Sequence, residues 1–344
     1  MKTAKFLRSL VAASLLTIVA AQAGSFAAAP DVTQNAQKVW FTKKENNIRM
    51  AGNLYKPENF DATKTYPAVV VVHPGGGVKE QTAGIYAQKL AAKGFITLAY
   101  DAAYQGESGG TPRYIEDPAS RVEDVRSAID YLDTLSFVDE NNIGVLGICA
   151  GGGYAVHTAE TEGRIKAVAA VSAVDSGRTR REGIAGSMTD ESRNKTLADV
   201  GKQRAIEARG GETRYINYVP DSAVGIPDGP AIEPNMYREF HEYYRTPRGS
   251  HPRSVNRYTY TSLDKMFAYT AFDHVDWISP RPLLLIAGSR AGTRYLSEDA
   301  YNMAKDPKEL YIIPNASHID LYDKPEYVDP AVDKLSQFYH RYLK

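Results

Sequence analysis

A lone cysteine stands at the tightest turn that the sequence predicts. Cys149 is the only cysteine in the 344 residues and lies in the run Gly-Ile-Cys-Ala-Gly-Gly at residues 147–152. A short apolar segment precedes this run and alanine-rich sequence follows it, which predicts a buried strand, a sharp turn and a helix. A strand that reverses into a helix brings backbone against backbone, so small residues are needed on both sides of the turn. The pattern is that of a nucleophile elbow, with a thiol where serine is usual.

The turn predicts a reactive thiol at Cys149. A helix N-terminus offers unpaired N–H groups and partial positive charge, which lower a thiol pKa from its free value of roughly 8.5 and favour the thiolate. A thiolate at this place can attack an acyl carbon. The alternative is that Cys149 is a buried small hydrophobe, the common fate of a single cysteine.

Two further features follow predicted strands. His318 comes after the last strand, and a glycine-rich loop at residues 75–77 follows an early one. The order of loop, cysteine and histidine resembles that of an α/β hydrolase. In that arrangement His318 acts as the general base, taking the thiol proton and later activating water. The N–H groups of Gly76, Gly77 and Ala150 are then expected to stabilise the oxyanion.

The elements that position these residues alternate along the chain. Residues 38–56 predict an opening hairpin, and the β-branched run at residues 68–72 predicts a central strand buried on both faces. Strands and helices then alternate as in a doubly wound parallel sheet, whose loops gather at the carboxyl ends of the strands. Strands at residues 282–288 and 309–314 and a helix over residues 330–342 close the domain. We therefore predict an α/β fold with a mostly parallel sheet.

About 100 residues interrupt this alternation, at residues 178–278. The stretch is rich in Arg and Tyr and shows helical patterns at residues 189–209 and 235–244. We interpret it as a cap insertion that shapes the substrate pocket, although a simple excursion at the sheet edge would have the same composition. Beyond it, Ser297 is expected to cap a helix that runs to about residue 305.

The first 29 residues have the features of a secretory signal peptide. Lys2, Lys5 and Arg8 precede an apolar run over residues 10–20, and small residues follow. That run is shorter than the roughly 20 residues of a membrane span. Small residues at 21–23 and at 27–29 both fit a cleavage site, so the mature protein starts at Gly24 or at Pro30. We expect the domain at residues 30–344 to be exported as a periplasmic or secreted protein. No stable membrane association is expected once the signal is removed.

Composition excludes some classes of function. The chain has 41 basic and 41 acidic residues and a formal net charge of zero, so electrostatics give no reason to expect a nucleic-acid partner. One cysteine precludes an internal disulfide, and the histidines outside the candidate site have no spacing that suggests a metal site. The composition leaves the oligomeric state open.

Four segments together resemble one enzyme family. Residues 73–81, 106–113, 147–152 and 316–322 are similar, in this order, to an exported branch of the α/β hydrolases related to dienelactone hydrolase. The resemblance implies the α/β-hydrolase fold, a cysteine nucleophile, and neither a metal nor an organic cofactor. It does not settle the substrate, for which we expect a small-molecule acyl compound. Because thiolates expel poor alkoxide leaving groups reluctantly, we expect activated esters, lactones or thioesters, cleaved through an acyl-cysteine intermediate.

The chain departs from this family in the acid of the catalytic triad. Such enzymes carry it shortly after the strand that here ends at Gly288, yet residues 291–293 are Ala-Gly-Thr. Hydrolases of this fold can supply the acid one strand earlier, which points to Asp175. Three other carboxylates compete for the role: Glu298, Asp299 and Asp320. The alternative function is a non-catalytic, hydrolase-like binding protein with an incomplete triad.

Overall fold

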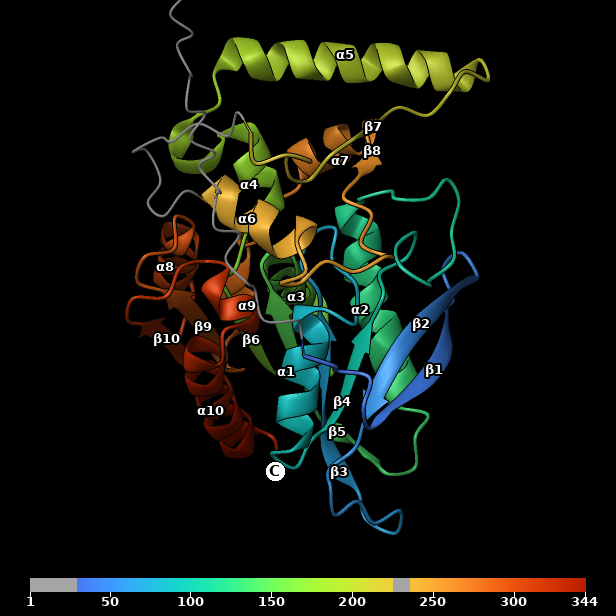
Figure 1. The fold of residues 1–344 in the computed structure, drawn as a ribbon. Helices are drawn as coiled ribbons and strands as arrows, with labels where there is room; N and C mark the ends of the chain where they lie inside the picture. The colour runs from blue at the N-terminus through green and yellow to red at the C-terminus, as the bar shows by residue number, and fades with distance from the viewer. Residues whose placement is uncertain (1–29, 225–235) are drawn as a thin grey trace, which may run out of the picture.

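An eight-stranded sheet forms the centre of the computed structural model, which describes residues 30–224 and 236–344 (Figure 1). The predicted signal peptide, residues 1–29, lies outside the described residues. The strands are β1 (Ala36–Lys43), β2 (Ile48–Tyr55), β3 (Tyr66–Val72), β4 (Ile96–Tyr100), β5 (Val138–Ile148), β6 (Ile165–Val171), β9 (Leu283–Gly288) and β10 (Lys308–Ile313). Their spatial order is β1-β2-β4-β3-β5-β6-β9-β10. β2 pairs antiparallel with β1 and β4, and all other neighbours are parallel. This is the predicted α/β-hydrolase architecture.

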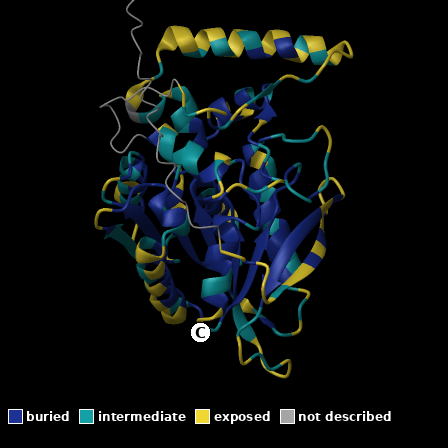
Figure 2. Ribbon diagram, viewed as in Figure 1, coloured by how far each residue is buried: buried dark blue, intermediate teal, exposed yellow. Residues whose placement is uncertain are grey.

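Helices cover both faces of the sheet. They are α1 (Thr82–Ala91), α2 (Pro118–Leu132), α3 (Ala150–Thr161), α8 (Arg294–Met303), α9 (Asp320–Asp323) and α10 (Pro325–Tyr342). α1 packs against α10, and α2 packs against α3. The connections through α1 and α3 run in opposite directions along the sheet, so right-handed crossovers place these two helices on opposite faces. Covered on both sides, the aliphatic side chains of β3 and β9 are buried (Figure 2). Within the described ranges, no helix has the length and hydrophobicity that crossing a membrane requires.

The strand order reverses at β3. β4 lies on one side of β3 and β5 lies on the other, so the chain leaves the carboxyl ends of β3 and β5 toward opposite faces. Such a switch point opens a crevice beyond the strand ends. Residues 73–77 follow β3 and Cys149 follows β5, so the glycine-rich loop and the thiol flank this crevice.

The segment between β6 and β9 lies over this end of the sheet (Figure 1). It contains α4 (Ser176–Arg181), η1 (Ile184–Gly186), α5 (Asp190–Ala208), β7 (Tyr215–Ile216), α6 (Met236–Arg245), β8 (Tyr258–Thr259), α7 (Ser262–Ala268) and η2 (Val275–Ile278). β7 and β8 form a separate two-stranded sheet. α5 is largely exposed (Figure 2) and packs against α7 through a small apolar cluster that includes Val200, Leu263 and Met266. From here on, "cap" denotes this segment.

Two helices begin earlier than the sequence predicts. α8 starts at Arg294, so Ser297 lies inside it and Thr293 precedes its first turn. The Thr293 side chain makes no capping bond there, which removes the usual signal of a helix start. α10 starts at Pro325 and contains Pro330, the predicted start. Proline is well tolerated in the first turn, so Pro325 is the better start.

Candidate active site

The turn after β5 has the backbone of a nucleophile elbow. Cys149 has φ 57° and ψ −123°, a conformation that L-residues rarely adopt. A Cβ at Gly147 would lie 2.1 Å from the carbonyl oxygen of Gly151, and one at Gly151 would lie 2.4 Å from that of Val72. The two glycines therefore allow the turn to form, and the strained residue between them directs its thiol into the crevice.

The thiol of Cys149 is buried, with only 9% of the residue exposed. Burial raises its pKa, while a hydrogen bond with the Tyr322 hydroxyl and hydrogen bonds from the N–H groups of Ala150 and Gly75 act to lower it. The balance lies above the ordinary value of a thiol. The expectation of a lowered pKa at Cys149 is therefore wrong for this structure, because desolvation outweighs the helix N-terminus. The resting group is a neutral thiol.

The oxyanion donors differ in part from those predicted. Ala150 and Gly75 direct their N–H groups at the sulfur, so these two amides surround the place where an acyl oxygen would acquire charge. The N–H of Gly77 instead donates to the carbonyl oxygen of Pro74 at 3.1 Å, closing a turn. Gly76 has φ 70° and lies under the ring of Tyr218. The structure thus adds Gly75 as a candidate donor from this loop and gives the Gly77 N–H another partner, while the role of Gly76 stays a prediction.

His318 is almost wholly buried and lies beside Thr293 and Tyr322. Its Nδ1 lies 2.6 Å from Oγ1 of Thr293, and its Nε2 lies 3.2 Å from the hydroxyl of Tyr322. The ring of Phe240 from the cap packs against the imidazole with centroids 5.3 Å apart. Burial lowers the His318 pKa to about 3, so the ring is neutral at neutral pH. A neutral imidazole that accepts a hydrogen bond from Tyr322 at Nε2 carries its proton on Nδ1 and donates it to Thr293.

The structure does not bring Asp175 to His318. Its Oδ1 accepts from the N–H of Arg178 at 2.9 Å, and its Oδ2 accepts from the N–H of Ala271 at 3.0 Å. Asp175 therefore caps α4 and ties two parts of the cap together. Thr293 occupies the position on His318 that the sequence analysis gave to Asp175.

The three competing carboxylates also have other partners. Glu298 bonds Arg294, Asp299 bonds Arg178, and Asp320 accepts from the Ser317 N–H and bonds Lys324. In the described residues, the group that orients the His318 ring is a neutral hydroxyl.

A cavity of about 250 Å³ opens from the thiol into the cap. Its floor is built by Gly75, Cys149 and Ala150. Most of the cap side chains that line it are aliphatic or aromatic: Val174, Ile184, Met188, Tyr218, Val219, Met236, Tyr237, Phe240, Tyr244 and Met266. The polar ones are Ser176, Thr179, Arg180 and Ser187. The thiol thus lies at the bottom of a pocket suited to an acyl group with apolar surface.

A buried carboxylate joins the cap to the oxyanion loop. Glu116 accepts hydrogen bonds from the hydroxyls of Tyr154 at 2.8 Å and Tyr218 at 2.7 Å, and it pairs with Arg121 at 3.3 Å. Arg121 also donates to the carbonyl oxygen of His73 at 2.7 Å. These bonds fix the Tyr218 ring over the loop that carries Gly75 and Gly76, so cap and oxyanion loop hold one another in place.

His73 supports the same loop from within the core. Its Nδ1 lies 2.7 Å from the carbonyl oxygen of Pro74, and its Nε2 accepts from the N–H of Ala102 at 3.0 Å. Burial and the nearby charge of Arg121 hold the His73 pKa well below its usual value. A neutral imidazole bonded on both sides is a brace and has no free nitrogen for proton transfer.

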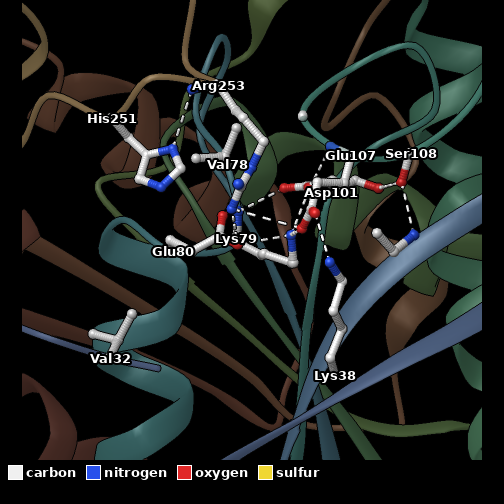
Figure 3. A network of polar contacts seen from close by, with 12 residues as sticks. Val32, Lys38, Val78, Lys79, Glu80, Asp101, Glu107, Ser108, His251 and Arg253 are labelled. Carbon is white, nitrogen blue, oxygen red and sulfur yellow. Dashed lines mark hydrogen bonds and ion pairs between the residues drawn. The ribbon is translucent and has the colours of Figure 1, made fainter. Parts of the chain in front are cut away.

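A network of charges secures the next part of the loop (Figure 3). The ammonium of Lys79, with no exposed side-chain surface, lies 2.8 Å from Asp101, 2.8 Å from Glu80 and 2.7 Å from Glu107. Burial acts to lower the Lys79 pKa, but the acidic neighbours raise it above its usual value. Arg253 from the cap bonds Glu80 at 2.5 Å. The loops after β3 and β4 are therefore locked together and to the cap.

Sequence reasoning missed Thr293 and Tyr322. Both lie in segments that it had singled out, but a single Thr or Tyr has no spacing that marks it as a catalytic neighbour. Among the described residues, no group of three or more His, Cys, Asp or Glu side chains could hold a metal ion.

Comparison with known proteins gives the site a context. The model of a family described as "Dienelactone hydrolase family" matches residues 50–182. YcjY, an uncharacterized protein of Escherichia coli strain K12, is 41% identical over 308 residues, which are 89% of this chain and 99% of YcjY. A crystal structure of the hypothetical protein PA2218 from Pseudomonas aeruginosa matches with a TM-score of 0.82 at 39% identity, covering 90% of this chain and 94% of that one. A protein named thiohydrolase from Eupenicillium brefeldianum is 24% identical over 270 residues, 78% of this chain and 84% of that protein.

Proposed function

Because the chain belongs to the dienelactone hydrolase family of α/β hydrolases, we propose that it hydrolyses activated acyl bonds through Cys149. The bonds are those of activated esters, lactones or thioesters. The observation that carries the proposal is the thiol itself, held in a strained elbow with the amides of Gly75 and Ala150 directed at it. A thiol kept only for packing needs neither the strain nor the amides.

The reaction divides into acylation and deacylation of the thiol. Cys149 attacks the acyl carbon, and the amides of Gly75 and Ala150 hold the oxyanion. Departure of the leaving group gives an acyl-cysteine, which water then hydrolyses with His318 as the base. Since both the thiol and the imidazole are neutral at rest, the thiol proton has to leave as the sulfur attacks. When Nδ1 donates its proton to Thr293, Nε2 is the nitrogen that can accept one.

The chemistry of the nucleophile favours thioesters within this class. A tetrahedral intermediate on sulfur expels the better leaving group, and a thiolate leaves as readily as the enzyme's own sulfur does, whereas an alkoxide does not. The name of the Eupenicillium relative, a thiohydrolase, agrees with this preference. The largely apolar cavity of about 250 Å³ fits an acyl group of moderate size. We also propose that the reaction takes place outside the cytoplasm, on the strength of the signal-like residues 1–29.

The test is turnover of a panel of p-nitrophenyl esters, acyl thioesters and enol lactones. The mature wild-type protein is compared with Cys149→Ala and Cys149→Ser, and the acyl-enzyme is sought by intact mass after rapid quench. We expect turnover that disappears in Cys149→Ala, together with a mass increase equal to the acyl group in wild type alone. Turnover retained by Cys149→Ala would refute the mechanism. No turnover or acylation on any substrate, with a thiol that alkylates slowly, would favour the non-catalytic binding protein.

A further inference from the structure

The hydroxyl of Tyr322 lies between the nucleophile and the base. It is 3.2 Å from Nε2 of His318, and it also forms a hydrogen bond with the thiol of Cys149. Cys149 and His318 are both in the described part of the chain, and no direct hydrogen bond joins them. Nε2, the nitrogen that a general base would use, is therefore directed at a tyrosine and not at the sulfur.

Tyr322 is held firmly in this place. The side chain is fully buried, and its ring meets the rings of Tyr243 and Tyr244 edge to face at centroid distances of 5.1 and 6.4 Å. It lies on α9, and His318 lies in the turn just before that helix, so one short stretch of chain carries both groups. Rings packed in this way do not turn aside easily, so the hydroxyl remains in the path between sulfur and imidazole.

We propose that Tyr322 is a catalytic residue that relays the proton between Cys149 and His318. This inference rests on the proposed function and names the route of its proton. The hydroxyl is both donor and acceptor, so it can accept a proton from Sγ while it gives its own to Nε2. A direct cysteine–histidine pair would need no such hydroxyl.

In acylation the proton on Sγ passes to the Tyr322 oxygen as the Tyr322 proton passes to Nε2. The sulfur electron pair forms the S–C bond, and the carbonyl π pair moves onto oxygen. Collapse restores the carbonyl and breaks the C–O or C–S bond of the leaving group, which takes a proton from the Tyr322 hydroxyl as the His318 imidazolium returns one to it. In deacylation water attacks the thioester and gives a proton to Tyr322 as the Tyr322 proton passes to Nε2 of His318. Collapse then releases the carboxylic acid, and the sulfur recovers a proton through Tyr322.

The surroundings suit a transfer that involves no stable ions. Burial and the neighbouring Cys149 and Tyr244 raise the pKa of Tyr322 well above its usual value, so tyrosinate does not accumulate. Three other groups face the site: Tyr243 and Tyr244 from α6 and Arg121 from α2. Glu239, also on α6, hydrogen-bonds Ser317 beside His318, and burial raises its pKa to about 7. Glu239 is thus the neighbour that titrates near neutral pH and has to be controlled in any pH profile.

The experiment measures single-turnover acylation by a p-nitrophenyl ester and by an acyl thioester. The variants are Tyr322→Phe, which removes only the hydroxyl, His318→Gln, and the double variant. Tyr86→Phe is the matched control, because the Tyr86 hydroxyl is buried nearby but bonds the carbonyl oxygen of Leu321 at 2.8 Å. All are made in wild type and in a Glu239→Gln background, and thermal melts check that each folds.

We expect Tyr322→Phe to slow acylation by about 10²-fold or more at neutral pH, the range of acid–base assistance. The rate should recover about tenfold per pH unit in alkali, where hydroxide supplies the thiolate. The double variant should be no slower than the slower single variant, because the two groups act in series. For wild type, rates in H₂O–D₂O mixtures should fit two protons in flight.

Three results would overturn the relay. The first is an acylation rate of Tyr322→Phe within about fivefold of that of wild type or of Tyr86→Phe. The second is a loss of rate in the double variant equal to the product of the two single losses. The third is an isotope dependence in wild type that fits one proton in flight. The isotope measurement needs no variant, so it decides the matter even if Tyr322→Phe fails to fold. If one of these results overturns the relay and Cys149→Ala is inactive, the proposed hydrolysis through Cys149 still stands. Activity in Cys149→Ala would refute both the relay and the proposed function.

Discussion

The hydroxyl that orients His318 gives a prediction with a definite magnitude. Thr293→Val keeps the shape of the side chain and removes the oxygen that lies 2.6 Å from Nδ1 of His318. Thr293 is 3% exposed and His318 is 1% exposed, so water cannot take the place of the lost oxygen. The variant leaves a buried N–H unpaired in the productive tautomer.

Leaving one neutral buried donor unpaired costs about 1–3 kcal/mol. At 1.36 kcal/mol per tenfold in rate, kcat/KM should fall by roughly 5-fold to 150-fold. Loss of the aspartate function in a serine triad costs about 10⁴-fold, because a carboxylate also stabilises the imidazolium. Thr293 carries no charge, and burial holds the His318 pKa to about 3, so the smaller loss is expected.

The assay is kcat/KM for an acyl thioester across pH 5–9, with Thr293→Ser as the matched control that keeps a hydroxyl. Thr293→Ser should stay within a few fold of wild type. Thr293→Asp adds a charge beside Nδ1, which favours the imidazolium and should raise the His318 pKa. A loss of 10³-fold or more in Thr293→Val would refute the reasoning, since a neutral hydrogen bond cannot supply that much. No loss at all would show that packing by Phe240 and the hydrogen bond of Nε2 with Tyr322 are enough to orient the ring.

Three further predictions concern groups outside the reacting centre. Asp175→Asn turns one acceptor into a donor facing the N–H of Arg178 or Ala271, so the unfolding free energy measured by urea titration should fall by about 1–3 kcal/mol. The kcat should stay near that of wild type, and a large loss of kcat with unchanged stability would restore Asp175 as the triad acid. Lys79→Met leaves buried Asp101 without its ion pair, so the unfolding free energy should fall by about 3–5 kcal/mol. Lys38→Met removes an exposed ion pair with Glu107 and should lower the unfolding free energy by under about 1 kcal/mol; equal losses would contradict the argument from burial. Burial raises the Glu239 pKa from 4.5 to about 7, so its contribution to stability is fully present below about pH 4.5 and is lost as pH rises through about 7. The melting temperature should therefore fall with pH over this range in wild type and not in Glu239→Gln, and an equal fall in both would disprove the raised pKa of Glu239.

Local sequence patterns were enough for the architecture. The β-branched and aliphatic runs of β3 and β9, the glycines around Cys149, and the helical segments at α5 and α6 depend on neighbours along the chain, and each is where the sequence predicts it. The sequence predicted two helix starts wrongly, since α8 begins at Arg294 and α10 at Pro325. The Thr293 hydroxyl hydrogen-bonds His318 and does not cap α8, and Pro330 is tolerated inside α10.

The composition of the site was only partly predictable. Ala150 could be expected to face the sulfur, because the residue after an elbow always does. Gly75 could not be distinguished from Gly76 and Gly77, because three adjacent glycines look alike until the loop has a conformation. Asp175 was the nearest carboxylate in the expected part of the chain, but its oxygens are used by Arg178 and Ala271 of the cap.

The amino-acid sequence by itself determined the sheet and the elbow that carries Cys149, because strand periodicity and glycine requirements act over a few residues. That Cys149 is the nucleophile stays a prediction. Only the tertiary structure decided that Thr293 and Tyr322 flank His318 and that Cys149 rests as a neutral thiol. Hydrogen-bond partners 25 residues apart along the chain meet only when strands align. A pKa set by desolvation depends on everything packed around the group, including the cap, and no local pattern records that burial.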